Sequence, residues 1–146
     1  MVLTRVVGRL DEVDLAGRRI ERIYLDADAM ARAHQLTVTD AGTEVGISLP
    51  RGTTLRRGDV VYVDADRVIV VEGIEEDVLV VRPRAPLEWG LVGFHLGNRH
   101  CQPFFEGSEV LVRYDHTVEE LLREIGVDFE RCRRRLSGVR PVVHAH

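Results

Sequence analysis

The chain has 146 residues, and 45% of them are apolar, which is enough for one ordinary domain or for two small ones. Its formal net charge of −4 argues against nucleic acid as a partner, because binding to a phosphate backbone needs a basic surface; the arginine-rich run at residues 131–135 is the local exception. No lysine is present, so chemistry that depends on one, such as a Schiff base or a P-loop, is excluded.

The sequence shows neither a membrane span nor a signal peptide. Residues 1–13 carry Arg5 and Arg9 without an apolar core of signal-peptide length, and no apolar run approaches the roughly 20 residues of a membrane helix. Cys101 and Cys132 are too few to build a disulfide framework. We therefore expect a cytoplasmic protein with free thiols and no membrane contact.

Short strands separated by turns are predicted for the first half of the chain. Turn sequences such as Asp40-Ala41-Gly42 and Arg57-Gly58-Asp59 recur at the spacing of a compact β domain. The alanine-rich segment at residues 26–33 is predicted to form a helical turn or two. The expected strands are residues 2–10, 19–25, 35–39, 44–49, 60–63 and 68–71.

The acidic stretch at residues 73–77 marks a boundary, because strands and helices alternate after it. The expected elements are a strand at 78–81, a helix at 86–97, strands at 103–105 and 109–114, a second helix, and a strand at 127–134. This β-α-β-β-α-β order is the ferredoxin-like plan, so the predicted class is α+β. The predicted parts are a small β domain at 1–73, a ferredoxin-like domain at 74–140, and a mobile tail at 141–146.

Local signals define the second helix of that domain. Thr117 and Glu120 are predicted to form a capping box at its start. The apolar stripe that begins at Val118 has helical spacing, and Gly126 is predicted to end the helix.

Histidines are concentrated in the C-terminal half, where five of the six follow residue 90. Two of them, His95 and His100, lie in the string Gly-Phe-His-Leu-Gly-Asn-Arg-His at residues 93–100. This concentration of imidazole, which is a common metal ligand, predicts a metal-binding site in this half of the chain.

His95 and His100 cannot chelate one ion as a pair on the same helix. At about 100° per residue they would point roughly 140° apart. Gly93 and Gly97 would lie nearly in line with His100 if the helix extended that far, and such a stripe lets a second helix come close. If that helix belonged to a second copy, a two-fold axis would bring two His100 imidazoles together. Alternatively, the glycines pack on the domain's own sheet and His100 caps the helix C-terminus.

Other candidate ligands each have two interpretations. His144 and His146 would point to one side of an extended tail and within range of one divalent ion, or they are an accident of a frayed end or a tag remnant. His116 next to Asp115 is either a secondary metal pair or part of a local helix cap. Cys101 is either a buried inert thiol or a conditional metal contact.

Two long strings carry a family resemblance: GTEVGISLPRGTTLRRGDVV in the first half and GFHLGNRHCQPFFEGSEVLVRYDHTVEELLREIG in the second. The two strings, in this order along the chain, resemble the UreE family of urease accessory metallochaperones. The resemblance implies a homodimer in which a β domain similar to the peptide-binding domain of Hsp40-type chaperones precedes a ferredoxin-like metal-binding domain. It also implies that His100 binds nickel across the dimer axis and that His144 and His146 complete the shell. His95 and His116 match histidines often found nearby.

The resemblance therefore predicts a nickel metallochaperone with no catalytic turnover of its own. It implies delivery of Ni(II) to the urease apoprotein and its accessory complex, including the GTPase. The chain has no His-Glu-x-x-His, Cys-x-x-Cys or glycine-rich phosphate loop that would point to an enzyme. Zn(II) and Cu(II) are alternative ions, because imidazole binds both. The alternative function is a protein- or peptide-binding accessory module whose histidines bind zinc or another divalent ion only for regulation.

Overall fold

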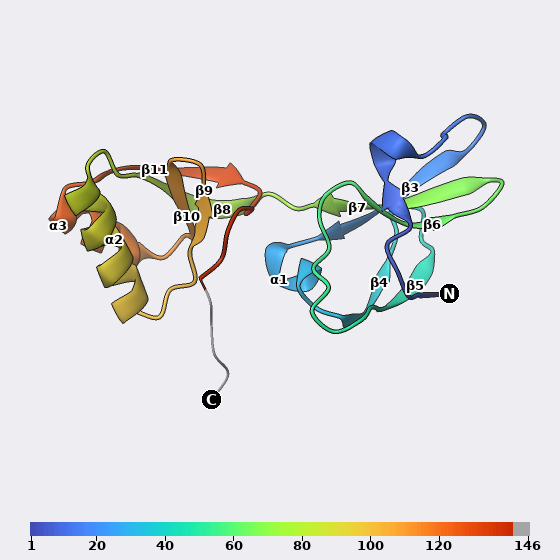
Figure 1. The fold of residues 1–146 in the computed structure, drawn as a ribbon, viewed down its shortest axis with the longest axis horizontal. Coiled ribbons are helices and arrows are strands. Elements are labelled where there is room, and N and C mark those ends of the chain that lie inside the picture. Colours follow the sequence, from blue (N-terminus) through green and yellow to red (C-terminus); the bar gives the residue numbers. More distant parts are fainter. Residues whose placement is uncertain (142–146) are drawn as a thin grey trace. The chain divides into compact units, whose positions relative to one another are not determined.

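The computed structural model describes residues 1–141 and divides into two compact units, Met1–Ile74 and Glu75–His146 (Figure 1). His144 and His146, the predicted tail ligands, lie outside the described residues. No helix in the described part of the chain is long and apolar enough to cross a bilayer.

The first unit is built from two β-sheets. One has the strand order β1-β5-β4 and the other β2-β6-β7-β3. A one-turn helix, α1, follows β3 and is capped by the Asp26 carboxylate, which accepts a hydrogen bond from the Ala29 N–H at 2.8 Å. The elements are β1 (Val2–Leu3), β2 (Gly8–Arg9), a 3-10 turn (Leu10–Glu12), β3 (Arg19–Leu25), α1 (Ala27–Met30), β4 (His34–Val38), β5 (Glu44–Ser48), β6 (Asp59–Val63) and β7 (Arg67–Gly73).

The single strand predicted at residues 2–10 is wrong, because the two ends of this segment pair with different sheets. β1 pairs in parallel with β5, whereas β2 pairs antiparallel with β6. The remaining predicted strands and the helical turn are present, with ends that shift by one or two residues.

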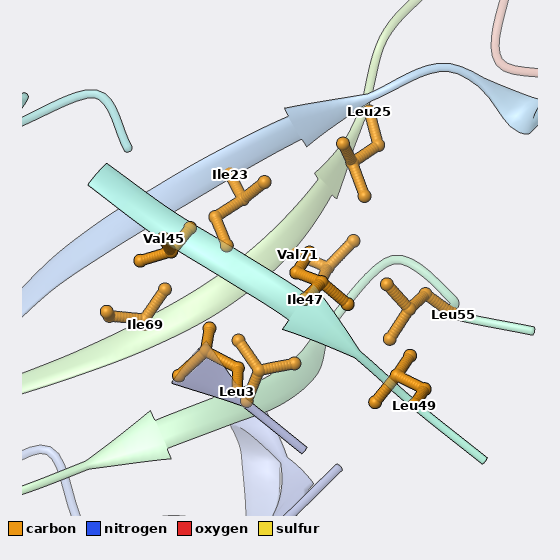
Figure 2. Close-up of a cluster of buried hydrophobic side chains, with 10 residues drawn as sticks. Leu3, Ile23, Leu25, Val45, Ile47, Leu49, Leu55, Ile69 and Val71 are labelled. Atoms are coloured by element: carbon orange, nitrogen blue, oxygen red, sulfur yellow. The ribbon is translucent and has the colours of Figure 1, made fainter. Parts of the chain in front are cut away.

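Apolar side chains from both sheets form the core of the first unit (Figure 2). Val45 and Ile47 of β5 alternate inward and are each 2% exposed, and Ile69 and Val71 of β7 are fully buried. Period-2 alternation of this kind lets one face of each strand bury its side chains. Each buried aliphatic side chain contributes about 1.5–3 kcal/mol relative to exposure.

One buried carboxylate ties the β4–β5 turn to the second sheet. Glu21 on β3 is 1% exposed, and its carboxylate accepts hydrogen bonds from the Thr39 and Thr43 hydroxyls, both at 2.7 Å, and from the Arg67 guanidinium at 3.1 Å. The Thr39 hydrogen bond, followed by those of Thr43 and Arg67, lowers the pKa of Glu21 to about 2. Glu21 therefore stays ionised in a site that satisfies its charge.

The second unit confirms the predicted β-α-β-β-α-β order and the α+β class. Its antiparallel sheet has the order β11-β8-β10-β9. Val92 and Leu96 of α2 and Val118 and Leu122 of α3 share one apolar cluster with the sheet, so both helices pack on it. The elements are β8 (Glu76–Arg82), α2 (Pro86–Asn98), β9 (Phe104–Glu106), β10 (Glu109–Arg113), α3 (His116–Ile125) and β11 (Asp128–Arg134).

The cap of α3 differs from the prediction. Asp115, and not Thr117, is the N-cap residue, and its carboxylate accepts from the N–H groups of Thr117 at 2.8 Å and Val118 at 3.4 Å. The Thr117 hydroxyl also donates to this carboxylate, at 2.6 Å, so it is not available to cap the helix itself. Gly126 ends the helix in a left-handed conformation with φ of 80°, as predicted.

Three arginines of the arginine-rich run lie on β11, and their hydrogen bonds and ion pairs go to different acceptors. Arg131 donates to both oxygens of Asp77, at 3.1 and 2.8 Å, and Arg134 forms an ion pair with Glu109 at 2.8 Å. Arg133 donates to the backbone carbonyl of Glu75 at 3.0 Å. Each of these three arginines therefore has an acceptor of its own within the second unit.

Candidate metal centre

Helix α2 carries His95, Gly93 and Gly97 of the predicted site. Its sequence determines which side of the helix faces outward. Pro86 fits the first turn because it lacks an N–H that would need a partner. Val92 and Leu96, four residues apart, are both 1% exposed and face the core. The opposite side carries Leu87, Leu91 and Phe94, which are 73%, 37% and 66% exposed.

The glycines of α2 face open space. A Cβ added at Gly90, Gly93 or Gly97 would meet no atom within 4 Å, apart from the helix's own neighbouring backbone. The interpretation that Gly93 and Gly97 pack on the domain's own sheet is therefore wrong. The outer face of α2 combines these glycines with three exposed apolar side chains, a combination typical of a surface that another element covers.

The helix stops before His100, so the condition under which His100 would align with Gly93 and Gly97 is not met. The helix ends at Asn98. The N–H of His100 bonds the Gly97 carbonyl and the N–H of Cys101 bonds the Leu96 carbonyl, both at 3.0 Å. This pair of bonds is a Schellman motif, which closes a helix with a residue in the left-handed region.

His100 occupies the left-handed position of that motif, where glycine is the usual residue. Its φ is 56°, and it is the one non-glycine residue with positive φ among residues 1–141. A side chain in this conformation costs about 1–3 kcal/mol, and such strain is concentrated at functional sites. The imidazole is exposed, and the backbone N–H of His100, as described above, closes the helix end.

The other predicted ligands lie at separate points on the second unit. His95 is in the last turn of α2, half-buried, with its ring edge-on to Phe94 at a centroid distance of 5.3 Å. His116 is the exposed first residue of α3, and its neighbour Asp115 serves as the helix cap. Within residues 1–141 no group of three His, Cys, Asp or Glu side chains is placed to hold a metal ion.

Cys101 is better suited to packing than to chemistry. Its side chain is half-buried against the apolar cluster between the helices and the sheet. Burial, and next the negative charge of Asp115, raise the pKa of the Cys101 thiol. A protonated thiol is a poor nucleophile and a poor metal ligand. Cys132 on β11 is also half-buried, and both cysteines are free.

Sequence reasoning missed two features of this region. Leu87, Leu91 and Phe94 have helical spacing of their own, and with Val92 and Leu96 they make α2 apolar on two opposite sides. That second stripe was readable in the sequence. The left-handed turn at His100 had no such signal, because no glycine marks it.

His100 is an exposed histidine next to the uncovered apolar face of α2. Comparison with known families identifies the protein that carries it. Residues 3–72 match the family model described as UreE urease accessory protein, N-terminal domain, and residues 76–138 match its C-terminal domain. The chain belongs to the UreE family. Both halves of the predicted resemblance are confirmed.

Curated relatives agree with the family models over the full length. Proteins named Urease accessory protein UreE are 37% identical in Bacillus sp. (strain TB-90), 35% in Geobacillus kaustophilus and 35% in Staphylococcus saprophyticus. Each alignment covers 100% of this chain and 99% of the relative. UreE family members are accessory proteins by name, and this chain is accordingly an accessory protein and not an enzyme.

Proposed function

We propose that this UreE family member is a nickel-binding metallochaperone that delivers Ni(II) during urease maturation, with the ion held between two copies of the chain. The observation that carries the proposal is His100, an exposed imidazole in a strained turn at the end of a helix whose outer face is uncovered. One imidazole is too few ligands for a stable site, so the rest must come from elsewhere.

The outer face of α2 supports a homodimer. Gly90, Gly93 and Gly97 leave room for a second helix to approach, and Leu87 and Phe94 supply apolar area that the approach would bury. A two-fold contact uses the same patch on both copies. His100 lies two residues after the end of this helix, so a two-fold contact through α2 would bring the two His100 residues near the axis.

His144 and His146 are proposed to complete the shell. His144 is three positions beyond Pro141 in the sequence, which spans at most about 10 Å when extended. Two His100 imidazoles and one tail pair would give four nitrogen ligands for a divalent ion. His95 and His116 are proposed as peripheral ligands that receive or release the ion.

The choice of nickel rests on the family role, because nitrogen ligands alone do not select it. Imidazole also binds Zn(II) and Cu(II), and the usual affinity order places copper above nickel. We propose that ion availability and docking to the urease apoprotein and its accessory complex, including the GTPase, decide which ion is carried. The free thiols of Cys101 and Cys132 support a cytoplasmic location, where thiols remain reduced.

Replacement of His100 tests this proposal. The wild-type protein is expected to bind one nickel ion per dimer with high affinity. His100→Ala should lose this high-affinity binding. Native mass spectrometry gives the number of bound ions, and titration calorimetry gives the affinity. His34→Ala is the matched control, because His34 lies in the first unit, where its ring bonds the Ser48 hydroxyl at 3.1 Å. High-affinity binding that survives in His100→Ala would overturn the proposal.

A second candidate function is supported by one apolar surface in the first unit. Val2, Leu36 and Val38 on the outer side of the β1-β5-β4 sheet are 68%, 90% and 52% exposed, and they line a shallow pocket with Gly46. This surface suits a protein or peptide partner, with metal binding serving only regulation. Leu36→Ser should then abolish binding to the urease accessory complex and leave nickel affinity unchanged. Undiminished complex formation by Leu36→Ser would count against this candidate.

A further inference from the structure

One row of residues across the β1-β5-β4 sheet forms a shallow apolar groove on its outer face. Gly46 on the central strand pairs with Val2 on one side and with Leu36 on the other, so the three residues lie in line. A Cβ at Gly46 would lie 3.5 Å from Leu36 Cδ2 and 3.9 Å from Val2 Cγ2. Val2 and Leu36 are therefore the walls of this Gly46 groove, and the glycine is its floor.

The first end of the Gly46 groove is acidic. Here Val38 on β4 pairs with Glu44 on β5, and Asp40 follows two residues after Val38. Both acidic side chains are exposed. At the other end of the two strands His34 pairs with Ser48, and the chain beyond this pair has the opposite charge.

Two segments that backbone hydrogen bonds hold together extend this second end. The Leu49 N–H donates to the Ala33 carbonyl and the Leu55 N–H donates to the Met30 carbonyl, both at 2.8 Å. Leu49 and Leu55 are 3% and 1% exposed, and both side chains point into the core (Figure 2). The loop between these leucines is therefore fixed at both ends beside the start of β4.

Exposed arginines make the second end basic. Arg32 lies on the first of these segments, between the two carbonyls that accept the hydrogen bonds, and Arg51 lies on the loop. Arg56 directly follows the last of the two bonds. Residues 29–38 and 49–58 contain no aspartate or glutamate, so these charges have no acidic neighbour along either segment.

A groove with apolar walls, one acidic end and one basic end suits a segment of protein better than a uniformly charged partner. Nucleic acid and an anionic membrane are negative over their whole surface, so the acidic end of the groove would repel them. A protein segment can place an apolar side chain between the walls and carry acidic side chains on one side of it only.

We infer that the Gly46 groove and the three arginines bind a segment of a protein partner in which apolar residues are followed or preceded by acidic ones. The apolar residues lie against Val2 and Leu36, and the acidic residues pair with Arg32, Arg51 and Arg56. The inference rests on the second candidate function above and names the chemistry of its partner.

A random peptide library displayed on phage tests this chemistry without a ligand chosen beforehand. Peptides selected on the full-length protein should be enriched in aspartate, glutamate and large apolar residues. Selection on Arg51→Glu/Arg56→Glu should lose the acidic preference, and selection on Leu36→Ser should lose the apolar preference. These positions are exposed, so the substitutions should leave the fold intact, which thermal unfolding checks.

Arg84→Glu/Arg123→Glu is the matched control, because it makes the same change of charge at two exposed arginines of the second unit. It should select the same peptides as wild type. One selected peptide, labelled with a dye, then gives affinities by fluorescence anisotropy. Arg51→Glu/Arg56→Glu and Leu36→Ser should each weaken its binding about tenfold. Added salt should weaken binding to wild type and have little effect on Arg51→Glu/Arg56→Glu.

Several outcomes would overturn the inference. Wild type that selects no common sequence, or that selects basic peptides, would exclude the proposed partner chemistry. Selection that is unchanged in both Leu36→Ser and Arg51→Glu/Arg56→Glu would place the binding surface elsewhere. Sedimentation with vesicles of phosphatidylcholine and phosphatidylserine is a further check, since vesicle binding that these variants abolish would identify a membrane as the occupant instead.

Nickel titration and complex formation distinguish this inference from the proposals on which it stands. If the library selects no acidic peptides while Leu36→Ser still disrupts the urease accessory complex, the second candidate function stands and the partner chemistry is wrong. If the library result is as expected while His100→Ala leaves nickel binding unchanged, the docking surface stands and the proposed metal site is wrong. Leu36→Ser and Arg51→Glu/Arg56→Glu should bind nickel as wild type does, because every proposed ligand belongs to the second unit.

Discussion

His100 stores backbone strain at the point where a ligand is proposed. It holds a φ of 56° at a helix end that glycine would close without strain. A residue selected for stability alone would be glycine here. The strain therefore favours a role for the imidazole that offsets its cost to stability.

Replacing His100 by glycine should make the metal-free protein more stable. The gain is expected to be about 1 kcal/mol, since relief of strain is partly offset by the greater flexibility of glycine in the unfolded chain. His100→Ala is the matched control, because alanine keeps the strain and also lacks the imidazole. Urea unfolding of both variants checks this, and equal stabilities would contradict the strain interpretation.

Glu21 should make the first unit sensitive to acid. Its folded pKa of about 2 lies below the ordinary value of 4.5, so its contribution to stability is fully present above about pH 4.5 and is lost as pH falls toward 2. Glu21→Gln is expected to cost about 2 kcal/mol at pH 7, because it removes a charged acceptor from a buried network. The difference from wild type should shrink as the pH is lowered to 3.

Urea unfolding at pH 7 and pH 3 measures the Glu21 effect. Glu12→Gln is the control, because Glu12 is exposed in the 3-10 turn. A Glu21→Gln penalty that is the same at both pH values would show that the carboxylate charge does not contribute.

At the scale of elements, a larger side chain on the glycine face of α2 is expected to stabilise the helix and to weaken the proposed dimer contact. Gly97→Leu meets no atom of its own chain within 4 Å at Cβ, and leucine is about 0.7 kcal/mol better than glycine in a helix. The substitution should therefore raise helix stability and weaken dimerisation by at least about tenfold, which corresponds to about 1.4 kcal/mol.

Sedimentation velocity over a dilution series measures the effect of Gly97→Leu on the proposed dimer. Glu124→Leu, on the exposed side of α3, is the control for a leucine placed on a helix surface. An unchanged dimer in Gly97→Leu would exclude the glycine face of α2 as the contact.

The elements were largely predictable, because their signals are local. Turn sequences separated the strands of the first unit, and Gly126 marked a helix end. Two caps for α3 were predicted, a capping box at Thr117 and local capping at Asp115 and His116. The structure has Asp115 as the cap, and its carboxylate reaches two N–H groups. Sequence spacing does not rank such competitors.

The candidate site was predictable only in part, because its features depend on contacts distant in sequence. His100 was identified from its string, but its turn is stabilised by Leu96 and Gly97 carbonyls and not by a glycine of its own. The pairing of Gly46 with both Val2 and Leu36 joins segments that are far apart in sequence, and the sequence pattern carries no sign of it. The tail residues His144 and His146 remain predictions.

At the scale of the whole molecule, each unit has an apolar core of its own. All five proposed ligands belong to Glu75–His146. Residues 75–146 expressed alone are therefore expected to fold, dimerise and bind nickel within about twofold of the full chain, a difference of about 0.4 kcal/mol. Calorimetry and sedimentation of this fragment check the expectation, and a fragment that dimerises but fails to bind would place a ligand in the first unit.

The open glycines of α2 have a consequence for how tightly the ion is held in a dilute solution. If a complete shell requires two chains, the ion is retained only while the chains stay together, so the occupied fraction of sites falls when the protein is diluted as well as when the ion is diluted. A partner that separates the two chains would then release nickel without competing for a single imidazole. Release of the ion would then follow dissociation of the two chains, and the amount of this protein in the cell would influence it.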